Sequence, residues 1–325
     1  MRYPLPGAFF KLVIFLILPA AACFAEQPSS APSPPQLVPV PKSLEQGKVD
    51  RPLREKYKAE FASRDPKERG ALGRKLREEA DKETDATAKF VRLREARDLS
   101  VDAGDFSYAV EVIDDIAATF TIDAQDMKQT ALMAGVDKSR VAPDDLARSY
   151  IKVCDDSLAI WNTDLAKKAA FLATKVAVGN RDLLAEAKER GKIANLRNRA
   201  LLAAIAANQK LAKTPDDPGA NQVLGAHVCF NLNRWDIGLR MLVKSPAGTL
   251  KSLAERDLAT PQDPAAMAAL ADGWWDFGEA KAGLAPGIGR RRSAYWYAKA
   301  LPGLTGEKKA QAEKRIAEIG EPPKP

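Results

Sequence analysis

The residues best suited to bind a ligand lie close together near the C-terminal end of the sequence. Three consecutive arginines are followed by aromatic residues, and two adjacent tryptophans precede them. Arginine beside tyrosine or tryptophan can stack on a sugar ring or a base, or hold an anion. We therefore predict a partner or ligand patch formed by Arg290, Arg291, Arg292, Tyr295, Trp296, Trp274 and Trp275.

Packing inside a helical core is the alternative role for these aromatic residues. In that case Trp296 packs against Trp274 or Trp275 between helices, and the arginine stems cover apolar surface. Three cations in the first turn of a helix also oppose the helix dipole, so a compensating group is expected near them.

Residues for catalysis or metal binding are few. His227 is the single histidine, so Ser-His-Asp, Cys-His and multi-histidine zinc sites lack partners. It shares helical spacing with Val223, Leu224 and Phe230, which indicates packing in or at the edge of a core. We predict no catalytic residues, no metal and no cofactor, and hence a protein that is not an enzyme.

Two of the three cysteines, those beyond the predicted leader, and several acidic pairs complete the chemistry-bearing residues. Cys154 and Cys229 lie far apart on two apolar stripes, which favours buried free thiols, and a disulfide is the alternative. The acidic pairs lack calcium-loop spacing, so they are interpreted as solvated faces or helix caps. They are Asp114-Asp115, Asp144-Asp145, Asp155-Asp156 and Asp216-Asp217.

Residues 1–25 are typical of an export signal. Arg2 and Lys11 are its positive charges, an apolar run follows, and small residues precede a cleavage site after Ala25. A lipid anchor on Cys23 is an alternative. A retained spanning helix is less expected because the apolar run is shorter than the ~20 residues that a bilayer requires. The sequence predicts an exported protein, periplasmic or associated with the cell envelope.

The composition favours a helical protein, and the charge argues against nucleic-acid binding. Alanine is abundant and aromatic residues make up only 7%, a mixture that favours helices over strands. The formal net charge of +7 is mild for a chain of this length, and two of the basic residues lie in the predicted leader. Nucleic acid is therefore not expected as a partner, and contact with a membrane is expected only through the signal or a lipid anchor.

The remaining chain divides into a tether, two helical arrays and a short tail. Proline is frequent in residues 26–52, which predicts an extended, disordered tether. Residues 53–213 form the predicted N-terminal array, ending in one long helix over 181–213. The prolines that follow mark the joint, and residues 214–320 form the C-terminal array, before a frayed tail at 321–325.

Apolar spacing of three to four residues predicts an all-α fold built from helical hairpins. Gly104 with Phe106, and Leu224 and Gly225 with Trp235, combine a small or left-handed residue with an aromatic near a turn. Small residues let two helices approach, and the aromatic fills the space between hairpins. We predict stacked antiparallel hairpins that form a tetratricopeptide-like α-solenoid.

Longer segments carry a resemblance to a known family. Residues 230–239, 252–259, 271–276 and 291–301, together with 93–105, resemble a tetratricopeptide-like region that recurs in exported proteins of planctomycete bacteria. The resemblance spans roughly residues 60–320. In that family the region usually lies beside a laminin-G-like, sulfatase-modifying-type or glycosidase-like module. No such module is expected here, because only a short proline-rich tail follows Ile319.

These observations converge on a binding function. We expect an exported, non-catalytic scaffold of the bacterial cell envelope that mediates protein–protein interaction, with an envelope protein or a peptide segment as partner. The alternative is an accessory protein that binds envelope polysaccharide through the aromatic and arginine patch.

Overall fold

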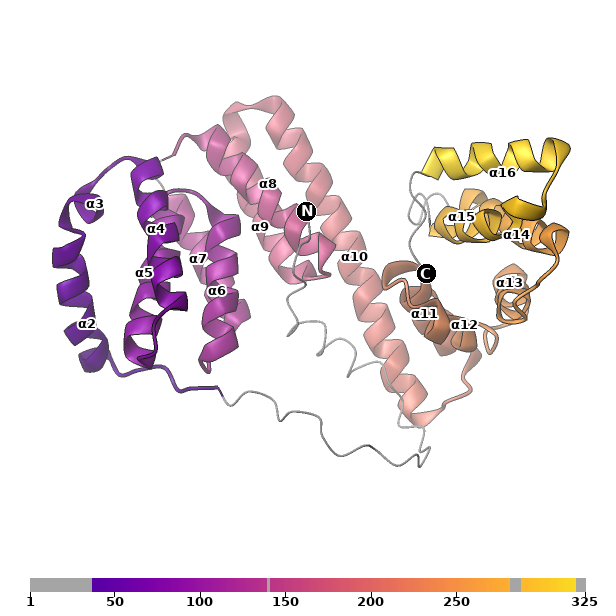
Figure 1. Cartoon of the computed structure of the whole chain (residues 1–325), viewed down its shortest axis with the longest axis horizontal. Helices are drawn as coiled ribbons and strands as arrows, with labels where there is room; N and C mark the ends of the chain where they lie inside the picture. The colour runs from indigo at the N-terminus through magenta and orange to yellow at the C-terminus, as the bar shows by residue number, and fades with distance from the viewer. Residues whose placement is uncertain (1–36, 139–140, 281–287, 320–325) are drawn as a thin grey trace. The chain divides into compact units, whose positions relative to one another are not determined.

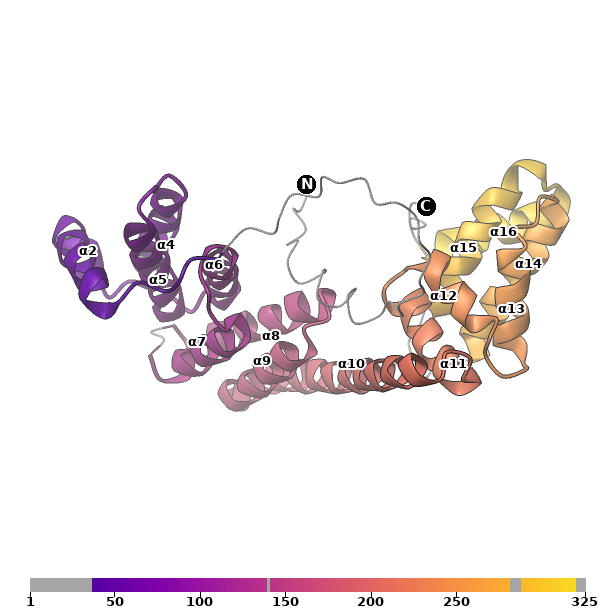
Figure 2. The same cartoon turned by 90° about the horizontal axis from the view of Figure 1, so that it is seen from below.

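The computed structural model describes residues 37–138, 141–280 and 288–319, and it is helical throughout (Figures 1 and 2). No β-strand occurs among these residues, only an isolated parallel bridge between Val38 and Phe120. The predicted all-α class is confirmed. The predicted tail at 321–325 and the leader lie outside the described residues.

The chain forms two compact units, which divide between Arg199 and Ala200, inside the long helix α10 (Arg181–Lys213). The sequence placed the joint after this helix instead. The division falls within α10 because its two halves pack in different cores. Its first half contributes Leu183 and Ala187 to the N-terminal unit, whereas its second half contributes Leu211 to the C-terminal unit.

The N-terminal unit consists of consecutive helices that begin at well-formed caps. Side chains of Asp65, Asp85, Asp105 and Asn162 each accept a hydrogen bond from a backbone N–H of the helix that follows. The elements before α10 are α2 (Ser43–Lys56), α3 (Lys58–Ala62), α4 (Pro66–Asp81), α5 (Ala86–Asp102), α6 (Phe106–Thr119), α7 (Ala124–Lys138), α8 (Pro143–Ala159), α9 (Thr163–Val176) and the 3-10 turn η1 (Ala177–Gly179).

Neighbouring helices of this unit contact each other in pairs. Helix α4 packs on α5, and α8 packs on α9, as the two views agree (Figures 1 and 2). Between α5 and α6, Gly104 adopts a φ of 73°, so the chain turns through a conformation that glycine tolerates best. Phe106 then stacks on Tyr150 of α8, with ring centroids 4.4 Å apart. The predicted turn at Gly104–Phe106 is thus present, and its aromatic residue is fully buried.

The predicted tether ends earlier than expected. Residues 43–52 belong to α2, in which Glu45 accepts a hydrogen bond from the backbone N–H of Lys42 at 3.1 Å. Pro52 lies inside this helix, so its lack of an N–H removes one helical hydrogen bond without ending the helix. Burial of Leu53 and contact of α2 with α5 stabilise the helix, and a count of prolines does not include such tertiary contacts.

The C-terminal unit contains the second half of α10 and the shorter helices that follow. In Figures 1 and 2 the last three α-helices lie side by side. The elements are α11 (Pro218–Ala226), the π-helical segment η2 (His227–Asn231), α12 (Trp235–Leu242), α13 (Thr249–Leu258), α14 (Pro264–Ala280), α15 (Ile288–Ala300), the 3-10 turn η3 (Leu301–Gly303) and α16 (Gly306–Ile319).

Glycines allow helices of this unit to approach closely. A Cβ placed on Gly238 would lie 2.4 Å from the Cys229 sulfur and 2.9 Å from the carbonyl oxygen of Gly225. Likewise, a Cβ on Gly278 would lie 3.2 Å from the backbone nitrogen of Arg290. Backbone therefore faces backbone where α11 meets α12 and where α14 meets α15.

Candidate functional site

The predicted aromatic and arginine patch lies mostly inside the C-terminal unit. Trp274 is fully buried and Trp296 is 2% exposed, and Trp275 is also buried. Tyr295 is half-buried, and of the three arginines only Arg291 is exposed. The faces of the buried indoles are covered by protein. The packing alternative expected Trp296 to lie against Trp274 or Trp275, and the ring that its indole contacts is Tyr295, with centroids 5.3 Å apart.

A buried carboxylate, Asp257 of α13, organises these side chains. Its Oδ2 accepts hydrogen bonds from Nε1 of Trp274 at 2.8 Å, Nε1 of Trp296 at 2.9 Å and Nε of Arg292 at 2.8 Å. A second nitrogen of the Arg292 guanidinium bonds Oδ1, so the ion pair is bidentate. With Asp257 only 1% exposed, these partners replace the water that a charged carboxylate would otherwise need.

The Arg292 guanidinium is held between aromatic rings as well. It lies 4.7 Å from the ring centroid of Trp235 and 4.3 Å from that of Tyr295. Cation–π contacts of this kind add attraction when the cation is largely removed from water. Arg292 therefore joins α13, α12 and α15 in one polar contact within an aromatic core.

Asp257 was not among the predicted site residues, although its position in the sequence carries a signal. Leu253, Ala254 and Asp257 share one face of α13 by helical spacing, and all three are buried. An acidic residue at an apolar position indicates a buried partner of opposite charge. The expected compensation for the arginines at the start of α15 is also present, because Arg290 pairs with Glu279 and Arg292 with Asp257.

His227 and the two cysteines are buried in the helical cores. His227 is 4% exposed, and its Nδ1 lies 3.0 Å from the Nδ2 of Asn231. Burial lowers the pKa of His227 to about 4, because the charged imidazolium loses its hydration. Cys154 and Cys229 are free thiols, as predicted, and burial raises the pKa of Cys154 to about 11.

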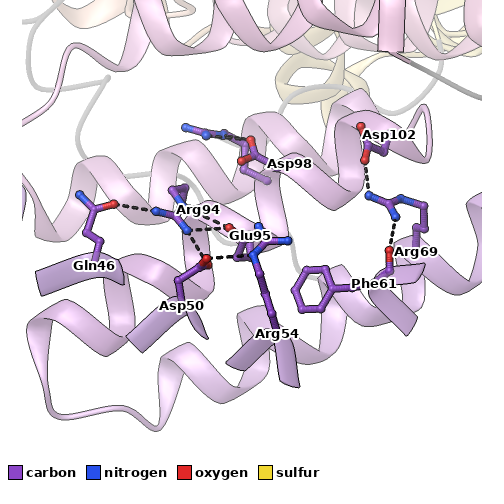
Figure 3. A network of polar contacts seen from close by, with 10 residues as sticks. Gln46, Asp50, Arg54, Phe61, Arg69, Arg94, Glu95, Asp98 and Asp102 are labelled. Carbon is purple, nitrogen blue, oxygen red and sulfur yellow. Dashed lines mark hydrogen bonds and ion pairs between the residues drawn. The ribbon is translucent and has the colours of Figure 1, made fainter. Parts of the chain in front are cut away.

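In the N-terminal unit, a buried carboxylate joins α2 to α5 (Figure 3). Glu95 is 3% exposed and accepts hydrogen bonds from Arg54 at 2.6 Å and from Arg94 at 2.7 Å. Arg94 also donates to Asp50 and Gln46 of α2, both at 2.7 Å. Burial raises the pKa of Glu95, and the two guanidinium groups oppose that shift by favouring the charged form. This network explains why α2 packs where the sequence predicted a tether.

A groove of about 800 Å³ lies between α5 and α7 of the same unit. Its apolar floor includes the buried side chains of Val101 and Ala131. Acidic residues line it from both helices, and Figure 3 shows two of them, Asp98 and Asp102, one turn apart on α5. The lining residues are Arg97, Asp98, Val101, Asp102, Ile122, Asp123, Asp126, Met127, Thr130, Ala131 and Ala134.

The acidic residues of the groove differ in their partners. Asp98 pairs with Arg97 at 2.7 Å, and Asp102 pairs with Arg69 of α4. Asp123 accepts a hydrogen bond from the backbone N–H of Asp126 at 2.9 Å, at the start of α7. Within the described ranges, no cation forms an ion pair with Asp123 or Asp126. The sequence did not predict this groove, because its acidic residues come from separate helices.

Three further findings concern metals, membranes and relatives. Within residues 37–138, 141–280 and 288–319, no three His, Cys, Asp or Glu side chains are grouped so that they could hold a metal ion. No helix in the same ranges has both the length and the apolar character needed to cross a bilayer. Comparison with protein-family models, curated proteins and solved structures finds no match for this chain.

Proposed function

We propose that this chain is an exported, non-catalytic helical-repeat protein that binds a peptide segment or a partner protein at the cell envelope. The observation that carries the proposal is the repeated contact between consecutive helices, α4 with α5, α8 with α9, α11 with α12 and α14 with α15. These contacts support the proposal that the helices form hairpins that stack into a tetratricopeptide-like solenoid, a fold whose extended surfaces suit peptides and proteins. Its export rests on the leader-like sequence of residues 1–25.

The groove between α5 and α7 supports a binding role for the N-terminal unit. Its volume is within the range of about 300–1,000 Å³ that is usual for ligand sites. It combines an apolar floor with charged groups at its margin. In many recognition sites apolar contact provides affinity and charged groups fix the orientation of the ligand.

A random peptide library panned on the immobilised full chain tests this proposal. We expect enrichment of sequences with a shared motif, and competition between the enriched peptides for one site. The result that would contradict the proposal is a selected pool no different from that of bare resin, with the chain shown to be helical by circular dichroism.

The polysaccharide alternative would have to use the accessible part of the predicted patch, chiefly Arg291 and Tyr295. Titration with envelope polysaccharide distinguishes the two functions, because four of the five tryptophans lie in the C-terminal unit. A saturable change in tryptophan emission that Arg291→Ala and Tyr295→Ala reduce would favour the polysaccharide function. Under the peptide-binding proposal, we expect the emission to stay constant.

A further inference from the structure

The groove between α5 and α7 has features that select one kind of partner. Its floor is apolar, from Val101, Ile122, Met127 and alanines of α7, so it favours aliphatic contact. Its margin carries four carboxylates, from Asp98, Asp102, Asp123 and Asp126, and one guanidinium, from Arg97. An aliphatic stem that ends in a cation matches both features.

The unpaired negative charge is concentrated on one side of the groove. Arg97 and Arg69 already neutralise the two carboxylates of α5. On the α7 side, Asp123 and Asp126 form no ion pair within the described residues, and both are exposed. A cation entering here would gain two carboxylates without breaking an existing ion pair, and Asp123 would keep the hydrogen bond from the backbone N–H of Asp126.

The backbone that adjoins the groove already pairs with an extended segment. Val38 donates its N–H to the carbonyl oxygen of Thr119, and Thr121 donates to the carbonyl of Val38, both at 2.9 Å. Thr121 directly precedes the groove residue Ile122. These backbone groups of Thr119 and Thr121 are therefore already paired, so a peptide in the groove is held through its side chains and not through pairing with this backbone.

We propose that this groove binds an extended peptide segment that carries lysine or arginine side chains. The aliphatic stem of such a side chain lies on Met127 and Ile122, and its charged end lies between Asp123 and Asp126. This inference rests on the proposed peptide-binding function and names the class of its partner. A second hollow, of about 630 Å³ on α2 and α3, is lined by acidic and basic residues in near balance and selects no charge.

Binding of three labelled peptides to the full chain tests the inference. One peptide alternates lysine with alanine, the second replaces lysine with glutamine, and the third replaces it with glutamate. We expect fluorescence anisotropy to detect binding of the lysine peptide, and its affinity to fall as salt is raised because the charges of the groove lie near solvent.

A matched pair of variants locates the site. The double change Asp123→Asn with Asp126→Asn removes both charges, and asparagine retains the capping role of residue 123. The control is Asp145→Asn with Asp276→Asn, which also removes two charges, because both residues are exposed and lie outside the groove. We expect the double variant to bind the lysine peptide roughly tenfold more weakly, and the control to match the wild-type chain.

The outcomes separate this inference from the proposed function. Equal affinity of the double variant and the control for the lysine peptide would overturn the groove assignment. So would tighter binding of the glutamine or glutamate peptide, and either result would leave peptide binding intact. If none of the three peptides binds and library panning also fails, the proposed function falls together with the inference.

Discussion

Asp257 stabilises the C-terminal unit through the partners that it accepts inside the core. Two indole N–H groups and one guanidinium converge on this carboxylate, and nearly all of its surface is removed from water. A buried carboxylate of this kind contributes little net energy relative to an apolar substitute. Removing it alone is costly, because Arg292, which is 12% exposed, would then be left as an unpaired charge.

Because His227 is buried, we expect the stability of the C-terminal unit to depend on pH. Its pKa falls from about 6.5 in the unfolded chain to about 4 in the folded one, because the buried ring resists protonation. Below pH 6.5 the unfolded chain binds more protons than the folded chain, so the free energy of unfolding decreases as pH falls from 6.5 to 4. We expect this loss to reach at most about 3 kcal/mol and to level off below pH 4.

Urea unfolding of the wild-type chain and His227→Gln at several pH values measures this contribution. Tryptophan emission follows chiefly the C-terminal unit, which holds four of the five tryptophans. Taking the difference in free energy of unfolding between the two proteins removes the effect of the carboxylates, which both proteins share. The difference in free energy of unfolding between the wild-type chain and His227→Gln should change between pH 6.5 and 4 and stay constant from pH 7 to 8. A difference that is independent of pH would show that the histidine ring is already protonated or accessible in the folded unit.

At the scale of helices, close packing depends on positions where a side chain has no room. Gly238 of α12 faces backbone of α11 and η2, so a methyl group there meets atoms that cannot rotate away. In contrast, a Cβ on Gly219 of α11 would meet only the side chain of Asp217, at 3.6 Å. Both glycines lie in the same unit and in helical conformation.

We expect Gly238→Ala to destabilise the C-terminal unit by about 1–3 kcal/mol, because the two helices must separate. Gly219→Ala should be neutral or stabilising by up to about 1 kcal/mol, since alanine lowers the entropy of the unfolded chain. Urea unfolding followed by tryptophan emission compares the two variants. Equal stabilities would mean that α11 and α12 lie farther apart than the structure has them.

At the scale of the whole molecule, the described residues of each unit include their own buried clusters and one buried thiol. Cys154 lies in a core of the N-terminal unit and Cys229 in a core of the C-terminal unit. Each thiol is at most 1% exposed, so a labelling reagent reaches it only when its unit opens. Labelling at the two positions therefore reports the opening of each unit separately.

We expect Asp257→Asn to speed the labelling of Cys229 at least tenfold and to leave the rate at Cys154 unchanged. The change breaks the pair with Arg292, a loss of about 3 kcal/mol or more from the C-terminal unit. The control is Asp276→Asn, which alters an exposed carboxylate of α14. Mass spectrometry of the labelled peptides distinguishes the cysteines, and equal acceleration at both would show that the two units unfold together.

Much of the helical structure was predictable from local sequence, for identifiable reasons. Asp65-Pro66 and Asn162 mark helix starts because their conformational preferences and capping groups act within one turn. The long helix over 181–213 was predicted because no proline interrupts it. The start of α2 and the division within α10 were not predicted, because both depend on packing between distant segments.

The two candidate sites also differ in how much of each could be predicted from local sequence. The arginine and aromatic cluster was visible as a motif, but spacing alone cannot tell a surface patch from a core. Trp274 and Trp296 are buried, and the partner of both indole N–H groups is Asp257, which lies on a different helix. The groove brings together residues of α5 and α7 that lie 24 to 37 positions apart.

The amino-acid sequence by itself determined that this chain is helical, where most of its helices begin and end, and that its thiols lie on apolar stripes. These properties follow from interactions among residues within a few turns of each other. Only the tertiary structure decided which charged groups are buried in ion pairs and which remain open to a partner. The reason is that burial and pairing depend on the helices that pack around a residue, and these come from distant parts of the chain.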